Sequence, residues 1–345
     1  MFGCYRYALA IMVVVSHLWP TYFPQVGGYA VFGFYMLSGY LMTFVLNRVY
    51  GFSGNGLSRF MMNRALRIYP PYLAVMLLSL FVVLVIPAEG KSVNPFLQLP
   101  TGAPAWLSNV FIFGLTYKSE TRLIPSAWSL YVELSFYLGM AVLLARWRVV
   151  SVIWFGLSLC YTLYMLGAHY PPDQRYYTLQ ASSLPFSTGS VICFIGEYLR
   201  GISRWHVIPA TLLFFLNGFT ASFIWRDAYL EGFYASLFFS AYLLIVLSSL
   251  DRQGMPDWLV RSDRALGDMS YPIFLCHFHV AALVIWLMFD GTRPPGSALF
   301  VSSFIFINCT AFIINVAIEH KVNRLRSVLR TSVTSIRNFR LVPGG

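Results

Sequence analysis

Apolar runs long enough to cross a lipid bilayer recur along the whole chain. A transmembrane helix needs roughly 17–25 mainly apolar residues. Short stretches that contain glycine, proline or charged residues separate the runs. The ten runs cover residues 4–20, 29–47, 69–87, 125–145, 149–166, 184–199, 207–223, 230–249, 270–289 and 298–319. This pattern predicts an all-α polytopic membrane protein with about ten transmembrane helices in one bundle.

The amino-acid composition agrees with a membrane protein. Apolar residues make up 58% of the 345 residues and charged residues 11%, and the mean hydropathy is +0.65. Soluble domains are about half apolar and about a quarter charged. Because no polar block is long enough for a separate domain, we expect one integral-membrane domain over 1–345. The five cysteines lie in apolar stretches without metal-ligand or disulfide spacing, so no metal site is expected.

The basic residues predict the orientation of the chain. The net charge of +11 is dispersed between apolar runs, which argues against a nucleic-acid partner. With the N-terminus inside, 18 of the 24 Lys and Arg residues fall in cytoplasmic segments, as the positive-inside rule requires. Both termini are therefore predicted to be cytoplasmic, and residues 320–345 form a short basic cytoplasmic tail. The outer loop 88–124 holds an apolar stretch too short to span, which we expect at the interface or folded back over the bundle.

Two ionisable residues lie in the first apolar run. Arg6 and His17 are eleven residues apart, close to three helical turns, so they share one face and are separated by about 16 Å along the axis. A polar residue as deep as His17 should face the bundle interior or a wet cavity. The alternative is a packing histidine beside an arginine that reaches the interface.

A second group of polar residues lies at the outer end of the fourth run. Ser126, Ser129 and Glu133 are spaced to line one helix face. Glu133 is the one carboxylate well inside an apolar run, and the helix directions place it at a depth similar to that of His17. A histidine paired with a carboxylate is suited to general-base catalysis. The alternative is a buried pair that only holds the helices together.

The first cytoplasmic loop contains two closely spaced arginines. Arg64 and Arg67 are one helical turn apart within residues 59–72, and their guanidinium groups could bind one cluster of phosphates. The alternative is that they only set the topology, because cytoplasmic loops are basic in general.

Taken together in order, these motifs resemble the acyltransferase family 3 membrane proteins. The resemblance covers nearly the whole chain. It implies a ten-helix, multi-pass enzyme of the bacterial inner membrane. Such enzymes move an acyl group, usually acetyl, from cytoplasmic acyl-CoA to a hydroxyl of an extracytoplasmic or lipid-linked glycan, such as an O-antigen or exopolysaccharide. The motifs are Arg6 with His17, FGFYMLSGYLMT (32–43), RALRIYPPY (64–72), SAWSLYVELSFY (126–137), LGDMSYPIFLCH (266–277) and Glu319.

The resemblance also implies a role for each site residue. His17 takes the catalytic role with support from Arg6, Arg64 and Arg67 face CoA, and Glu133 lies in a functional motif. We expect no tightly bound cofactor, with acetyl-CoA or another acyl-CoA as co-substrate and membrane lipids as surroundings. The supporting or substrate-binding candidates are Ser126, Ser129, Tyr271 and His277, the first three as possible oxyanion donors.

Two hypotheses without covalent chemistry compete with the transferase. In a proton-coupled transporter, the buried histidine and glutamate would relay protons and the arginines would gate an anion. Two observations argue against the transporter. The sequence shows no inverted repeat, and a base near the outer side of the membrane with arginines on the cytoplasmic side suits one-way group transfer. The second hypothesis is a scaffold subunit for glycan assembly, and it does not explain why Glu133 places a carboxylate well inside an apolar run.

Overall fold

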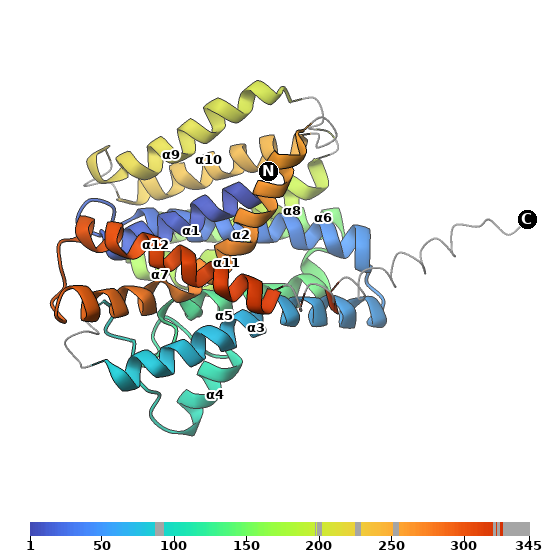
Figure 1. Cartoon of the computed structure of the whole chain (residues 1–345). Helices are drawn as coiled ribbons and strands as arrows, with labels where there is room; N and C mark the ends of the chain where they lie inside the picture. Colours follow the sequence, from blue (N-terminus) through green and yellow to red (C-terminus); the bar gives the residue numbers. More distant parts are fainter. Residues whose placement is uncertain are drawn as a thin grey trace, which may run out of the picture.

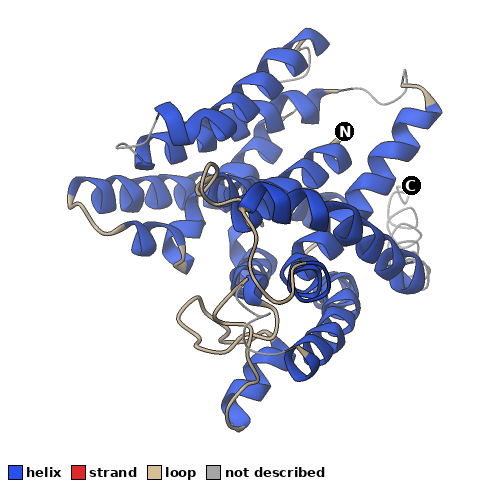
Figure 2. Cartoon of the chain, turned by 60° about the vertical axis from the view of Figure 1, so that its left-hand side comes forward, coloured by secondary structure: helices blue, strands red, loops and turns tan. Residues whose placement is uncertain are grey.

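The computed structural model describes residues 1–86, 93–196, 198, 202–224, 229–250, 255–319, 322 and 325–326, and these residues form helices and loops without strands (Figure 2). The basic tail predicted over 320–345 lies, apart from three positions, outside the described residues, as does the side chain of Glu319. The helices are α1 (Phe2–Leu18), α2 (Val26–Val45), α3 (Gly54–Val85), α4 (Ala103–Phe111), α5 (Trp128–Gly139), α6 (Arg148–Gly167), α7 (Pro172–Tyr176), α8 (Leu179–Ile195), α9 (Val207–Ile224), α10 (Tyr229–Ser249), α11 (Asp257–Met288) and α12 (Gly296–Ile314). Single π-helical turns extend α2, α5 and α12.

Each of the ten predicted runs coincides with a helix, and seven helical segments of the described chain are long and apolar enough to cross a membrane. Helices α1 and α9 are apolar but shorter in their described parts. Helix α8 has 17 residues, and Pro185 and several hydroxyl side chains interrupt its apolar sequence. The all-α multi-pass membrane class is therefore confirmed. The count of ten spans and the cytoplasmic position of both termini stay predictions.

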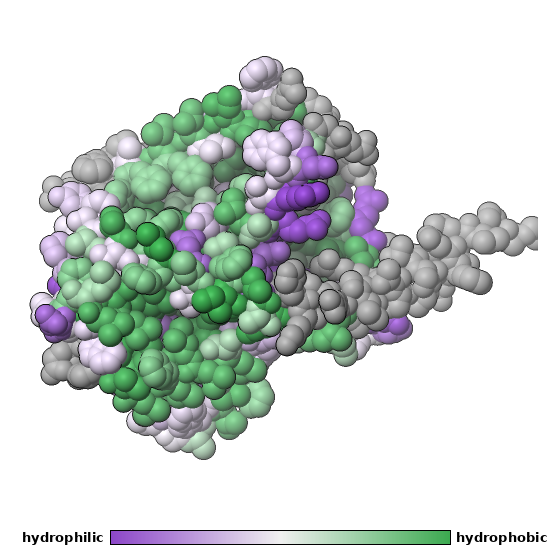
Figure 3. All heavy atoms as spheres, in the orientation of Figure 1, coloured by the Kyte–Doolittle hydropathy of each residue, from purple (hydrophilic) through white to green (hydrophobic). Residues whose placement is uncertain are grey.

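The outer surface of the bundle suits a lipid environment. Figure 3 shows apolar side chains over most of the face that it draws, with hydrophilic residues gathered near the N-terminus and the start of α11. Large apolar side chains such as Leu77, Val149 and Phe238 are more than 60% exposed. Exposed apolar surface on this scale is stable only against lipid or another protein.

Helices α2 and α8 cross at very close range in the centre of the bundle (Figure 1). A Cβ atom on Gly189 would lie 1.9 Å from the carbonyl oxygen of Met36, and one on Gly39 would lie 2.1 Å from that of Phe186. Small residues at membrane helix crossings let the backbones touch in this way. The contact places α2, with Ser38, against the site described below.

Helix α1 packs along α11, and its first turn is held there by a carboxylate. The Oδ1 atom of Asp263 accepts a hydrogen bond from the backbone N–H of Cys4 at 2.9 Å, and its Oδ2 lies 3.6 Å from the N-terminal amine. Negative charge at a helix N-terminus is stabilising. Gly3 makes the close approach possible, because a Cβ there would lie 1.6 Å from the carbonyl oxygen of Asp263. These contacts fix the height of α1 along α11.

Two helices extend beyond the predicted apolar runs. Helix α3 begins at Gly54 and α11 at Asp257, so the segment 59–72 that we predicted as a cytoplasmic loop lies on α3. The Oγ atom of Ser53 accepts a hydrogen bond from the Gly56 N–H at 3.2 Å and caps the start of α3. An apolar run marks only the part of a helix that matches lipid, and capping together with packing against α11 lets the helix continue.

The described residues 93–124 between α3 and α5 fold back against α3 and α11. The apolar stretch within them forms α4 and leaves Leu107 and Phe111 more than half exposed, so its predicted place, at the interface or over the bundle, stays a prediction. Asn109 on α4 holds the loop, because its Nδ2 donates to Thr121 O at 3.2 Å and its Oδ1 accepts from Leu123 N–H at 2.8 Å. Tyr72 on α3 donates to the carbonyl of Asn109. His279 on α11 lies 2.7 Å from the carbonyl oxygen of Leu123 through its Nε2. The loop therefore forms a fixed part of the molecule near His279.

Candidate functional site

Three arginines and a glutamate line one cavity inside the bundle. This arginine cavity has a volume of about 130 Å³ and receives Arg6 from α1, Arg64 and Arg67 from α3, and Glu133 from α5. Tyr271 on α11 lines it as well. Ser129 on α5 also lines it, so the structure brings together six of the predicted site residues.

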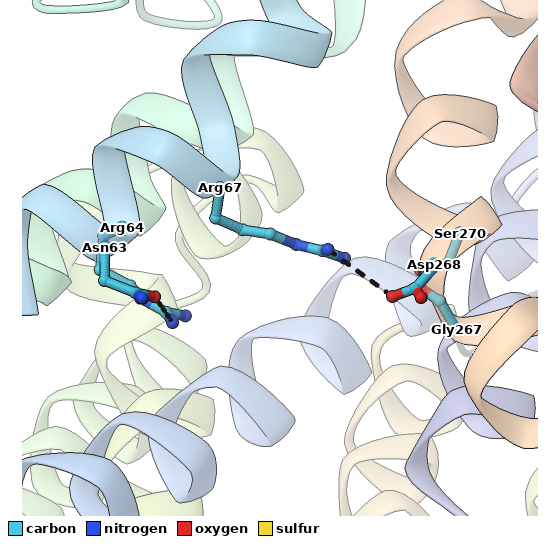
Figure 4. A network of polar contacts seen from close by, with 6 residues as sticks. All are labelled: Asn63, Arg64, Arg67, Gly267, Asp268 and Ser270. Carbon is cyan, nitrogen blue, oxygen red and sulfur yellow. Dashed lines mark hydrogen bonds and ion pairs between the residues drawn. The ribbon is translucent and has the colours of Figure 1, made fainter. Parts of the chain in front are cut away.

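The two arginines of α3 extend to the same side of that helix (Figure 4). Arg64 is only 8% exposed, and its Nη2 donates to the Oδ1 of Asn63 at 2.7 Å. Arg67 reaches across to α11, where its Nη1 lies 3.7 Å from the Oδ1 of Asp268. On the same stretch of α11, Gly267 makes room for Arg6, since a Cβ there would lie 2.7 Å from the Arg6 Nη2.

The charges around this cavity favour an anionic ligand. Three guanidinium groups and the carboxylate of Glu133 line it, and the carboxylate of Asp268 pairs with Arg67. Guanidinium groups form charge-assisted, forked hydrogen bonds with phosphate. The cavity can therefore hold a phosphate-bearing molecule.

Glu133 contacts α2 and its own helix instead of His17. Its Oε1 accepts a hydrogen bond from the Oγ of Ser38 at 2.7 Å and one from the hydroxyl of Tyr137. The predicted His17–Glu133 pair is therefore wrong, although Glu133 shares a cavity with Ser129 as the common helix face required. The physical reason is that similar depth does not make two residues neighbours, because α5 packs on α2 and α1 packs on α11.

His17 lines a second cavity, which we call the histidine cavity. Its volume is about 430 Å³, and Ser126 and several aromatic side chains line it together with His17. Val31 on α2 and Phe274 on α11 line both cavities. The two cavities therefore meet at these two side chains, with the arginines on one side and His17 on the other.

The hydrogen-bond partner of His17 is His277. The Nδ1 of His17 lies 3.0 Å from the Nε2 of His277, and the two ring planes are within 7° of parallel. His277 is fully buried, and its Nδ1 lies 2.8 Å from the carbonyl oxygen of Phe274. A nitrogen that faces a carbonyl carries the proton, so the neutral ring of His277 accepts through Nε2. His17 then donates through Nδ1, which leaves the lone pair of its own Nε2 available as a base.

The three candidate oxyanion donors use their hydroxyl protons on backbone carbonyls. Ser126 donates to Phe274 O at 3.1 Å, and Ser129 donates to Ser126 O at 2.9 Å. Tyr271 donates to Ile68 O at 3.0 Å and so ties α11 to α3. In this arrangement all three support the site by fixing its helices. Ser126 and His277 share one acceptor, the carbonyl of Phe274, so Ser126 is connected to His17 through this carbonyl and His277.

Aromatic rings and one arginine complete the histidine cavity on the side of the folded-back loop. Tyr117 and Tyr177 stack at 4.7 Å between ring centroids, and Trp128 meets Tyr177 edge-on at 4.9 Å. The guanidinium of Arg122 lies 4.1 Å from the ring centroid of Phe96. Burial lowers the pKa of Arg122 to about 10, so it keeps its charge at neutral pH. Trp128 lies in the motif 126–137 but was not predicted as a site residue, and the other residues come from loop and helix segments that only the fold brings together.

The comparisons with known proteins assign the chain to a family. No curated protein and no solved structure matches it. The family model described as an acyltransferase domain matches residues 4–320 and so includes the lining of both cavities. The chain therefore belongs to acyltransferase family 3, and it is a multi-pass membrane acyltransferase.

Proposed function

We propose that the protein transfers an acyl group, most simply acetyl, from cytoplasmic acyl-CoA to a hydroxyl of an extracytoplasmic or lipid-linked glycan. The observation that carries this proposal is the pair of cavities that meet at Val31 and Phe274. One cavity is lined by guanidinium groups and the other by aromatic rings and a histidine with an available nitrogen. Such a pair suits an anionic donor on one side and a hydroxyl-bearing acceptor on the other.

The donor side of the proposal rests on the arginine cavity. Phosphates of acyl-CoA would bind Arg64 and Arg67 with help from Arg6, through forked, charge-assisted hydrogen bonds. The ion pair between Arg67 and Asp268 is long, at 3.7 Å, so a phosphate can compete for this guanidinium. The pantetheine arm would then extend between Val31 and Phe274 towards His17. The cytoplasmic location of this side follows from the positive-inside rule.

The acceptor side rests on the aromatic lining of the histidine cavity. The rings of Trp128, Tyr176 and Tyr177 offer flat apolar faces, and Arg122 offers a charged donor. Sugar rings present both apolar C–H faces and hydroxyl groups, so a glycan can stack on the aromatic rings while its hydroxyls find polar partners.

The proposed reaction is a direct transfer with His17 as the general base. The Nε2 of His17 removes the proton from the acceptor hydroxyl while that oxygen attacks the thioester carbonyl. The carbon–sulfur bond then breaks, and the CoA thiolate leaves and takes the proton back from His17. The products are an ester and free CoA, so atoms and charges balance. General-base help of this kind is typically worth about 10²- to 10⁴-fold.

In this mechanism His277 is a positioning residue, because it fixes the tautomer of His17. Replacing His277 with leucine should lower kcat by about 10- to 100-fold, since His17 loses the acceptor that holds its Nδ1 proton. A glutamine at this position can place its Oε1 where the imidazole Nε2 lay, so His277→Gln should keep more activity than His277→Leu. Steady-state kinetics should show an unchanged KM for acyl-CoA in both variants. Equal losses of kcat in the two variants would show that His277 only fills space.

The proposed function is tested by following a labelled acetyl group. Purified protein in liposomes that contain a lipid-linked glycan should transfer label from [¹⁴C]acetyl-CoA into the glycan fraction, and mild alkali should release the label as acetate because the product is an ester. Protein-free liposomes are the control. Passage of a solute across the membrane with no label in the glycan fraction would favour the transporter.

A further inference from the structure

A third cavity opens on the side of the bundle, away from the two described above. This lateral groove has a volume of about 670 Å³, and helices α6, α8 and α10 line it. Its lining is mostly apolar and includes Leu163, which is 57% exposed, and Phe238, which is 70% exposed. Because α8 packs against both α6 and α10, it forms the floor of the groove, and the exposed side chains of Leu163 and Phe238 place the opening at the outer surface of the bundle. The groove shares no lining residue with the arginine or histidine cavity.

One charged side chain is buried in this apolar lining. Arg175 on α7 is only 9% exposed, and it lines the groove. Within the described part of the chain its Nε has no hydrogen-bond partner, and its guanidinium has no ion pair. Asp173, on the same short helix, accepts a hydrogen bond from the hydroxyl of Tyr117 instead. Burying a guanidinium costs free energy unless an anion pairs with it. The described residues supply no such anion, so the groove is suited to a ligand that carries one.

Helix α7 also connects the lateral groove to the histidine cavity. Arg175 lines the groove, whereas the next residue, Tyr176, lines the histidine cavity. The ring of Tyr176 meets that of Trp128 at 5.6 Å between centroids. A molecule with an apolar chain along the groove and an anionic group at Arg175 therefore has its polar part at α7, one residue from the lining of the histidine cavity.

We infer that the lateral groove binds the lipid carrier of the acceptor. The long apolar chain lies along α6, α8 and α10, the phosphate that joins chain and glycan pairs with Arg175, and the glycan enters the histidine cavity. This inference rests on the proposed function, because it specifies the acceptor as a phosphate-linked lipid glycan. The charge of Arg175 selects phosphate, and the lateral opening selects a lipid over a water-soluble sugar.

Binding of lipids to the purified protein tests the inference directly. Native mass spectrometry in detergent should show that a polyprenyl phosphate binds more tightly than the matching polyprenol, which lacks the phosphate. Arg175→Gln should weaken polyprenyl phosphate about 10- to 150-fold, the usual effect of losing one charge-assisted contact, and should leave polyprenol unchanged. Arg175→Lys should keep most of the affinity. Lys118→Gln removes an exposed charge from the neighbouring loop and should have no effect.

A second variant tests the groove without changing the charge. Ala241 on α10 lines the groove, so Ala241→Phe should fill part of it and weaken polyprenyl phosphate and polyprenol alike. Tight binding of polyprenyl phosphate to Arg175→Gln would overturn the inference. Equal, Arg175-dependent binding of phosphatidylglycerol would also overturn it, because the groove would then be a general phospholipid site.

The same samples separate this inference from the proposed function. Acyl-CoA binding measured by calorimetry reports on the donor side of the site and does not involve the lateral groove, which shares no lining residue with either cavity. Normal CoA binding without selective binding of polyprenyl phosphate would refute the lipid-carrier site and leave the transferase standing. Selective lipid binding without any CoA binding would refute the donor side of the proposed function while supporting the groove.

Discussion

Replacing His17 with alanine is expected to abolish acyl transfer while the protein still folds and inserts into the membrane. The variant loses the general base, and the expected fall in kcat is about 10²- to 10⁴-fold. The hydrogen bond to His277 is lost too, but α1 stays fixed through Cys4 and Asp263 at its other end. The measurement is transfer of label from [¹⁴C]acetyl-CoA by purified protein, with size-exclusion chromatography to check folding.

A second histidine provides a matched control for this prediction. His206 is exposed and lies 2.7 Å from the hydroxyl of Tyr242 through its Nδ1, and it lines neither the arginine nor the histidine cavity. His206→Ala should keep wild-type activity. If His17→Ala keeps more than a tenth of the wild-type rate, His17 has no part in the chemistry.

Changing Arg64 and Arg67 together to glutamine is expected to raise the KM for acyl-CoA strongly. Each lost charge-assisted contact with a phosphate costs about 1.5–3 kcal/mol, a factor of about 10 to 150 in affinity. Glutamine keeps some hydrogen bonding but removes the charge, so kcat at saturating acyl-CoA should change little. Steady-state kinetics and calorimetric CoA binding measure the two effects separately.

An arginine outside the cavity is the matched control for this pair. Arg146 is exposed, stacks on Trp147 at 4.5 Å from the ring centroid, and lies in a segment predicted to be cytoplasmic. Arg146→Gln removes one positive charge from the same predicted side of the membrane and should leave CoA binding unchanged. Wild-type CoA affinity in the double variant would mean that Arg64 and Arg67 only set topology and that the donor binds elsewhere.

The sequence by itself determined the class of the protein and the residues worth testing. Apolar runs of membrane-spanning length report the lipid environment residue by residue, so the helices follow from hydropathy alone. The common face of Ser129 and Glu133 follows from helix geometry, which is local. Ser126 departs from the predicted face, because it lies in the 3₁₀ turn before α5 and lines the histidine cavity. The motifs also named the family, because their order along the chain is a property of the sequence.

Only the tertiary structure decided which of these residues meet. The depth of a residue along its helix does not say which other helix lies beside it. The sequence therefore could not show whether His17 pairs with His277 on α11 or with Glu133 on α5. Close glycine contacts set these neighbours: Gly3 lets α1 approach α11, and Gly189 lets α8 approach α2. The burial of Arg175 also follows only from the tertiary structure. In the sequence, Arg175 lies in a short polar stretch that would be expected to be exposed. Helix packing is a long-range property, and it decides which side chains share a cavity.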